Sequence, residues 1–138
     1  MKISAQWLGE RYKFSARNER GLSVVFDVPS ENSPGEGPMP MEVYLQALAV
    51  CSGMDVVGIL RKRRLKIERL MVEAEAERAD QHPKIFTRIV LKFRAAGEGL
   101  SEQELERAVK LSMDKYCSVK AMIDPAKTAI TAECFIDE

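Results

Sequence analysis

The fold of this chain is constrained most by residues 38–64, which read PMPMEVYLQALAVCSGMDVVGILRKRR. This is the longest segment compatible with a helix. Pro40 suits the first helical turn, where a missing N–H has no intrahelical partner to lose. The basic residues 61–64 lie at the end that the helix dipole favours for positive charge. Because apolar residues occupy nearly every side, we expect this helix to be buried all round, at the centre of a domain or a dimer.

Size and composition indicate one soluble domain spanning residues 1–138. The chain has 21 basic and 21 acidic residues, and this balance argues against nucleic acid as a partner. The chain contains no uninterrupted run of 18 apolar residues, so no membrane span is expected. The first residues lack the apolar core of a secretory signal, so we expect a cytoplasmic protein. In a reducing compartment its three cysteines are not expected to form structural disulfides.

Alternating apolar residues predict strands at residues 2–8, 12–16, 22–28, 66–78, 85–95 and 127–136. A second helix is expected over residues 101–115, opened by the capping box Ser101-Glu-Gln-Glu104, with a short helical turn at 117–123. The predicted order is βββ–α–ββ–α–β, an α+β fold with about six strands and two principal helices.

The two long strands after the central helix carry opposite charges on their outer faces. We expect these side chains to pair across the hairpin. The acidic set is Glu73, Glu75 and Glu77, and the basic set is Lys84, Arg88, Lys92 and Arg94.

Two of the cysteines occupy positions that suit a reactive thiol. Cys51 lies in mid-helix among small residues, which leaves space beside its sulfur. Cys117 lies at a break between helices, where a following helix N-terminus would lower its pKa. The alternative is that both are small core hydrophobes, as we expect for Cys134 on the apolar face of the last strand. The cysteine spacings and the single His82 match no compact metal motif, so no metal site is expected.

Two carboxylates on the central helix raise different questions. Glu42 opens the helix nine residues before Cys51, where the dipole alone explains a carboxylate. Asp55 lies one turn after Cys51 on the same side of an apolar helix, so it must find a partner. That partner is either a structural Lys or Arg, or a member of a site.

The segment PMPMEVYLQALAVCSGMDVVGIL, followed 66 residues after its cysteine by KYCSVKAMI, resembles the OsmC/Ohr family. This family comprises osmotically induced protein C and the organic hydroperoxide resistance proteins, and the likeness is to a less characterised branch of it. The resemblance spans almost the whole chain, because the predicted element order is also the family's. It implies an intertwined homodimer with the two central helices buried together and a site at each end of the interface.

The resemblance also implies a thiol peroxidase acting on organic hydroperoxides without a bound cofactor. The family's first cysteine matches Cys51, which would attack the peroxide as thiolate and become a sulfenic acid. The second matches Cys117, which would condense with it to a disulfide that a dithiol, often lipoyl-linked, then reduces. Glu42, and with it Asp55, would orient or polarise the surroundings of the two cysteines. Residues expected to line an apolar pocket beside it are Met39, Met41, Tyr44, Met54, Asp55 and Tyr116.

Two positions depart from the peroxidase pattern. Met41 stands ten residues before Cys51, where peroxidase members carry a glutamate, and none of Arg11, Arg17 and Arg20 matches the family's thiolate-binding arginine. The rival interpretation is therefore a non-catalytic small-molecule-binding or redox-sensing protein. A third interpretation is a structural dimerisation module with inert buried thiols.

Overall fold

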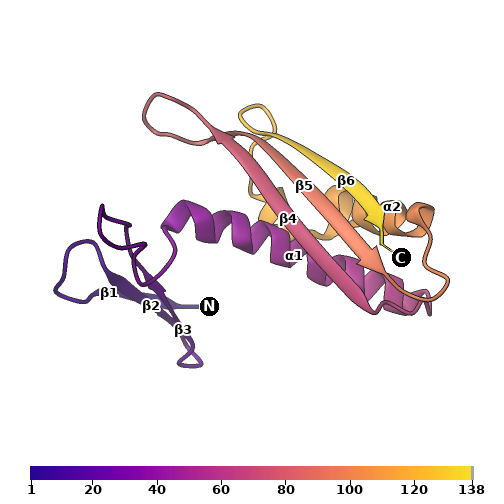
Figure 1. The fold of residues 1–138 in the computed structure, drawn as a ribbon, viewed down its shortest axis with the longest axis horizontal. Helices are drawn as coiled ribbons and strands as arrows, with labels where there is room; N and C mark the ends of the chain where they lie inside the picture. The colour runs from indigo at the N-terminus through magenta and orange to yellow at the C-terminus, as the bar shows by residue number, and fades with distance from the viewer. Residues whose placement is uncertain (138) are drawn as a thin grey trace. The chain divides into compact units, whose positions relative to one another are not determined.

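The computed structural model describes residues 1–137. In chain order its elements are β1 (Ile3–Trp7), β2 (Phe14–Asn18), β3 (Ser23–Phe26), α1 (Pro40–Lys62), β4 (Arg69–Arg78), β5 (Phe86–Ala96), α2 (Glu102–Leu111), the π-helical turn η1 (Ser112–Tyr116), α3 (Ser118–Ala121) and β6 (Ala129–Ile136) (Figure 1). This order confirms the predicted α+β fold. The residues form two compact units that divide after Tyr44, so the single domain over residues 1–138 stays a prediction.

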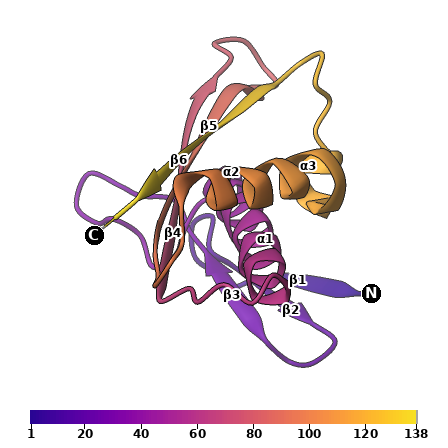
Figure 2. The same cartoon turned by 90° about the vertical axis from the view of Figure 1, so that its right-hand side faces the viewer.

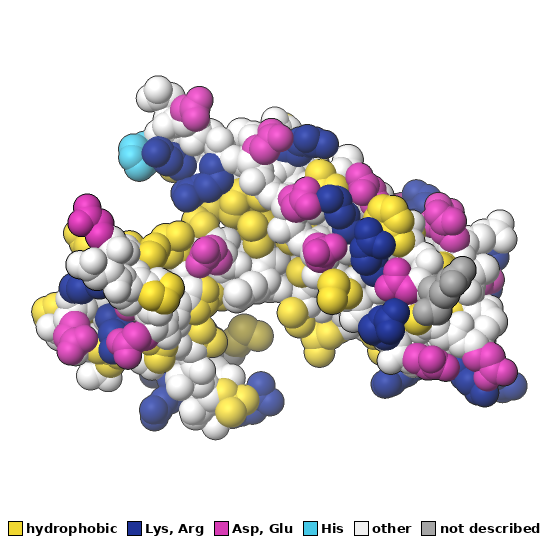
Figure 3. Space-filling view, in the orientation of Figure 1, with side chains coloured by type: hydrophobic (Ala, Val, Ile, Leu, Met, Phe, Trp, Pro, Cys, Tyr) yellow, Lys and Arg dark blue, Asp and Glu magenta, His cyan; other side chains and the backbone are white. Residues whose placement is uncertain are grey.

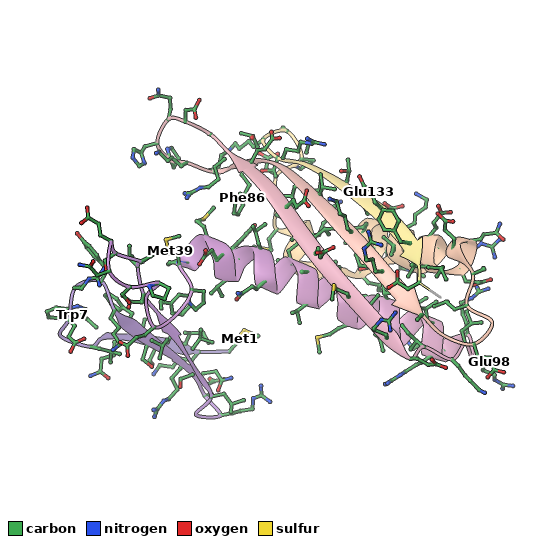
Figure 4. All side chains as sticks on the ribbon, viewed as in Figure 1. Met1, Trp7, Met39, Phe86, Glu98 and Glu133 are labelled. Carbon is green, nitrogen blue, oxygen red and sulfur yellow. The ribbon has the colours of Figure 1, made fainter. Side chains whose placement is uncertain are left out.

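The N-terminal unit contains an antiparallel sheet with the order β1-β2-β3, which confirms the predicted meander. The loop that follows it is closed by Asp27, whose carboxylate accepts the backbone N–H groups of Glu36 at 3.0 Å and Val28 at 2.8 Å. These two hydrogen bonds lower the pKa of Asp27. The loop leads to Met39, which lies directly before α1 (Figure 4).

The second unit contains a sheet with the order β4-β5-β6, in which β5 is the central strand. Its pairing with β4 is antiparallel and its pairing with β6 is parallel. A parallel pair needs a crossover connection, and α2, η1 and α3 supply it. Helices α1 and α2 cover one face of this sheet (Figures 1 and 2). Consequently β5 contributes much of the core, with Ile89, Leu91, Phe93 and Ala95 fully buried.

The opposite face of the sheet carries the predicted ion pairs. Three of the four predicted cations pair: Arg88 with Glu77 at 3.4 Å, Lys92 with Glu75 at 2.7 Å and Arg94 with Glu73 at 3.9 Å. Positive and negative side chains lie interspersed over these strands (Figure 3). Because the pairs are solvent-exposed, each adds little stability. Their effect is to keep this face of the sheet polar.

Helix α1 is buried on one side only within the single chain. The fully buried positions repeat every four residues: Leu48, Ser52, Val56 and Leu60. On another side Val50 is 59% exposed and Met54 is 71% exposed. Burial all round at the centre of a domain is therefore wrong for one chain. Burial of the remaining side in a dimer stays a prediction.

Among the described residues, α1 is the one helix with the length and mean hydropathy, 1.7, of a membrane span. The core helix of a soluble protein meets the same two criteria. The packing of α1 against β4 is that of a core helix. The two elements approach so closely at Gly53 that an added Cβ would lie 3.3 Å from the side chain of Val72. Helix α1 is therefore a candidate core helix and not a clear membrane span.

Candidate functional site

The structure brings together three side chains that are far apart in the sequence. The sulfur atoms of Cys51 and Cys117 and a carboxylate oxygen of Asp55 all lie within 4.8 Å of one another. Cys51 and Asp55 are four residues apart on α1, and residues at this spacing share one face of a helix. We call these three residues the thiol–carboxylate cluster.

Cys117 is held in place by the end of the second helical segment. The sequence predicts a regular helix up to residue 115, but its last turn widens into η1, and Cys117 N–H donates to the Ser112 carbonyl at 2.9 Å. This bond spans five residues, as in a π-helix, and such turns are frequent at functional sites. On the other side, the Lys120 N–H donates to the Cys117 sulfur at 3.4 Å. Both contacts fix the position of this thiol.

The predicted lowering of the Cys117 pKa is wrong. The thiol is only 3% exposed, and burial raises its pKa to about 11. The Lys120 N–H acts in the opposite direction but does not compensate, while the neighbouring Cys51 and Asp55 side chains raise the pKa further. Cys117 is therefore a neutral thiol at pH 7.

Asp55 finds its partner in a residue to which the sequence analysis gave no role. The hydroxyl of Ser112 donates to Asp55 Oδ2 at 2.8 Å, and Ser112 is itself fully buried. The partner is thus neither a Lys nor an Arg, and membership of Asp55 in a site stays a prediction. The sequence signal for Ser112 is weak, because a serine within the predicted helix over residues 101–115 has no pattern that marks it.

A cavity of about 410 Å³ adjoins the cluster, and Asp55 belongs to both. Among the residues predicted to line a pocket, Met54, Asp55 and Tyr116 do so. The remaining lining residues are Gly58, Ile59, Lys62, Arg63, Arg107, Ala108 and Leu111. The wall is thus largely apolar with several cationic side chains. Met39, Met41 and Tyr44 belong to the N-terminal unit, and their place in a pocket stays a prediction.

Glu42 has a local structural role at the start of α1. Its Oε2 accepts a hydrogen bond from the Met39 backbone N–H at 2.7 Å, which satisfies one of the free donors at the helix N-terminus. Its predicted orienting role at the cysteines stays a prediction. Among the early arginines, Arg11 donates to the Val28 carbonyl at 2.9 Å.

Cys134 lies on β6, outside the thiol–carboxylate cluster. It is half-buried, and burial raises its pKa to about 11, with smaller contributions from Glu106 and Glu102. It lies on the strand as predicted but is not one of the buried core residues. It also gives the chain an internal control for experiments on the other two thiols.

Comparison with known proteins supports the family resemblance stated from the sequence. The sequence profile of a family described as OsmC-like protein matches residues 33–133, which include both cysteines of the cluster. The chain belongs to the OsmC-like family. Protein YhfA of Escherichia coli strain K12 is 36% identical over 126 residues, and the match covers 91% of each chain.

Solved structures place the OsmC-like fold over nearly the whole chain. The OsmC-like protein from Mycoplasma pneumoniae superposes with a TM-score of 0.85 at 16% identity, covering 99% of this chain and 96% of that one. The organic hydroperoxide resistance protein OhrB of Bacillus subtilis superposes with a TM-score of 0.61 at 16% identity, over 99% and 96%. At these identities the likeness concerns the fold alone. The family resemblance inferred from the two cysteine motifs is confirmed.

Proposed function

We propose that this OsmC-like protein is a thiol-dependent peroxidase that reduces organic hydroperoxides through Cys51 and Cys117. The observation that carries the proposal is the meeting of two thiols, 66 residues apart in sequence, within 4.8 Å beside a largely apolar cavity. The protein called OhrB, whose fold this chain shares, is an organic hydroperoxide resistance protein. The proposed role of the protein is therefore in defence against oxidative stress.

Cys51 is the attacking residue in this scheme. It is half-buried, whereas Cys117 is 3% exposed, so a hydroperoxide reaches the Cys51 sulfur first. The Cys51 thiolate gives an electron pair to the outer peroxide oxygen, and the O–O bond breaks. The departing alkoxide takes a proton and leaves as an alcohol, and Cys51 becomes a sulfenic acid.

Cys117 is the resolving residue. Its raised pKa keeps it protonated at neutral pH, which suits a thiol that acts second. Its sulfur bonds to the Cys51 sulfur, while the hydroxyl of the sulfenic acid leaves with the Cys117 proton as water. An external dithiol, lipoyl-linked in the scheme that the family resemblance implies, then supplies two electrons and two protons. It restores both thiols and becomes a disulfide itself.

The neighbouring residues bind and orient the substrate. The alkyl group lies in the 410 Å³ cavity against Met54 and Tyr116. Asp55, held by the Ser112 hydroxyl, is the polar group of the cavity wall that also reaches the sulfur atoms. It accepts the Cys51 proton as the thiolate forms and returns it to the departing alkoxide. From the first turns of α1, Glu42 is proposed to orient the site, and Met41 and Tyr44 are proposed to line the substrate pocket.

The proposed working form is a cytoplasmic homodimer. A second groove runs along the exposed side of α1, where Val50, Met54 and Val57 lie next to Leu70 and Val72 of β4. Val50 and Met54 are exposed and the other three are half-buried. An exposed apolar patch of this kind is typical of an interaction surface. A monomer in light scattering at the concentration of the activity assay would contradict the dimer.

The test is turnover of cumene hydroperoxide with dihydrolipoamide as reductant. We expect Cys51→Ser to abolish turnover and Cys117→Ser to block its recycling after one round. Cys134→Ser is the matched control and retains full activity. Undiminished turnover by the Cys51→Ser variant would refute the assignment.

A second candidate function is ligand binding or redox sensing without turnover. It is favoured by the carboxylate of Asp55, because its negative charge raises the pKa of the neighbouring Cys117 thiol. The absence of the family's glutamate at Met41 points the same way. Oxidation to a disulfide without sustained peroxide consumption, or a small molecule retained through purification, would support this alternative.

A further inference from the structure

The thiol–carboxylate cluster has a second chemical capacity that does not depend on peroxide. Its three potential donor atoms, the sulfurs of Cys51 and Cys117 and a carboxylate oxygen of Asp55, lie within 4.8 Å of one another. In a tetrahedral zinc site, with Zn–S near 2.3 Å, two ligand atoms are about 3.8 Å apart. The cluster is therefore within about 1 Å of a coordinating arrangement, a distance that side-chain rotation covers.

The ligands come from rigid elements. Cys51 and Asp55 lie one turn apart on α1, a 23-residue helix in which the adjacent positions Ser52 and Val56 are fully buried. Cys117 is fixed by its backbone bond to Ser112 and by the Lys120 N–H. Donors held by packed elements keep their separation without a metal, so the ordering cost on binding is small.

The carboxylate also has the support that metal-binding carboxylates usually show. Ser112 Oγ donates to Asp55 Oδ2 at 2.8 Å, which fixes the orientation of the carboxylate and leaves its other oxygen lone pairs for a ligand. The hydroxyl itself is fully buried and comes from a different element, η1. Ser112 is therefore a positioning residue for Asp55.

The donor set determines which cation fits. Two thiolates and one carboxylate are the ligands of zinc-type ions, whereas calcium and magnesium require oxygen donors throughout. The deprotonated cluster would carry three negative charges, and a divalent cation offsets two of them. Three protein ligands leave the fourth position of a tetrahedral ion open to water.

We propose that the reduced cluster of Cys51, Asp55 and Cys117 is a binding site for one thiophilic divalent cation of the zinc class. Sequence spacing alone argued against metal, because the cysteines are 66 residues apart and no histidine lies near them. The fold supplies the proximity that spacing cannot show. Because a disulfide consumes both sulfur donors, the oxidised protein does not bind the ion.

The test is titration of the reduced, metal-free full-length protein with Co²⁺ and displacement by Zn²⁺, with no peroxide present. We expect one equivalent per chain, with thiolate-to-cobalt charge-transfer absorption and the visible bands of a tetrahedral ion. Cys51→Ser and Cys117→Ser should abolish the charge-transfer band of a two-thiolate site. Cys134→Ser is the matched control and should leave both the band and the affinity unchanged.

Two conservative variants test the carboxylate arm. Asp55→Asn keeps the size of the side chain, and Ser112→Ala removes only the supporting hydroxyl; for Ser112→Ala we expect about tenfold to hundredfold weaker binding. Asp55→Asn should weaken binding at least as much. An absent charge-transfer band in the wild-type protein, or equal affinity in Asp55→Asn, overturns the proposal. Neither result bears on peroxide turnover, which is measured separately without metal.

Discussion

The reactivity of Cys117 should follow pH in a way that its burial dictates. Its pKa rises from the ordinary 9.0 to about 11, with burial as the largest cause. Below pH 9 the folded protein then holds roughly one hundredth of the Cys117 thiolate found in the unfolded chain. Alkylation of Cys117 should therefore be at least about a hundredfold slower in the folded protein, and its rate should keep climbing through pH 9 towards 11.

The same shift links Cys117 to stability. A group whose pKa is raised by folding binds its proton more tightly in the native state, so the stability it contributes is complete below pH 9. This contribution is lost as the pH rises through about 11. Unfolding by urea should accordingly require less denaturant at pH 10.5 than at pH 8.

The assay is a pH series of iodoacetamide labelling on the fully reduced protein, with each cysteine quantified separately by peptide mass spectrometry. The unfolded protein in urea provides the reference rate, which should reach half its plateau near pH 9 and level off above it. Cys134, whose pKa is also raised to about 11 by burial, should behave as Cys117 does. A Cys117 labelling rate in the folded protein that levels off at or below pH 9 would refute the reasoning.

Three stability predictions concern the second unit. Leu91→Ala, at a fully buried position of β5, should lower the free energy of unfolding by about 2–5 kcal/mol. Met71→Ala is the control, because Met71 on β4 is 54% exposed, and it should change this free energy by no more than about 0.5 kcal/mol. Equal losses in urea melts would contradict the described core. Gly97→Ala should destabilise by at least about 1 kcal/mol, because the added Cβ would lie 2.0 Å from the Lys66 carbonyl oxygen, and an unchanged melting temperature would disprove that close approach. Ser101→Ala removes the N-cap of α2 and should cost about 1 kcal/mol by the same measurement.

The order of the elements could be predicted because it depends on local patterns. Alternation along residues 69–78 appears directly as exposed and half-buried positions on β4. The N-cap part of the predicted capping box is confirmed, because the Ser101 hydroxyl accepts from the Glu104 N–H, whereas the Glu104 carboxylate pairs with Arg63. Proline and glycine between these segments marked the loops, since these residues act on the backbone within a few positions.

The site was less predictable because its contacts are not local. The pairing of Cys51 with Cys117 came from the family resemblance, and neither spacing nor periodicity indicated it. The hydrogen bond between Asp55 and Ser112 joins residues 57 positions apart, and it depends on how α1 packs near η1. The pKa of Cys117 is raised and not lowered as predicted, because the effect of burial outweighs that of one backbone N–H. Burial is a property of the folded chain and is not visible in the local sequence.

The π-helical turn is a further feature beyond local prediction. Residues 112–116 have a composition that fits a regular helix, and the sequence analysis extended the helix through most of them. The wider turn is closed by the hydrogen bond from the Cys117 N–H to the Ser112 carbonyl. A single extra residue in the turn thus changes which side chains face α1.

The most direct test of the account is mass spectrometry of the intact, reduced protein after one equivalent of cumene hydroperoxide, with remaining thiols blocked. The account predicts the loss of two hydrogens, mapped by peptide analysis to a bond between Cys51 and Cys117, with Cys134 still a free thiol. An unchanged mass, or a disulfide that includes Cys134, would contradict the claim that the first two cysteines form one redox pair.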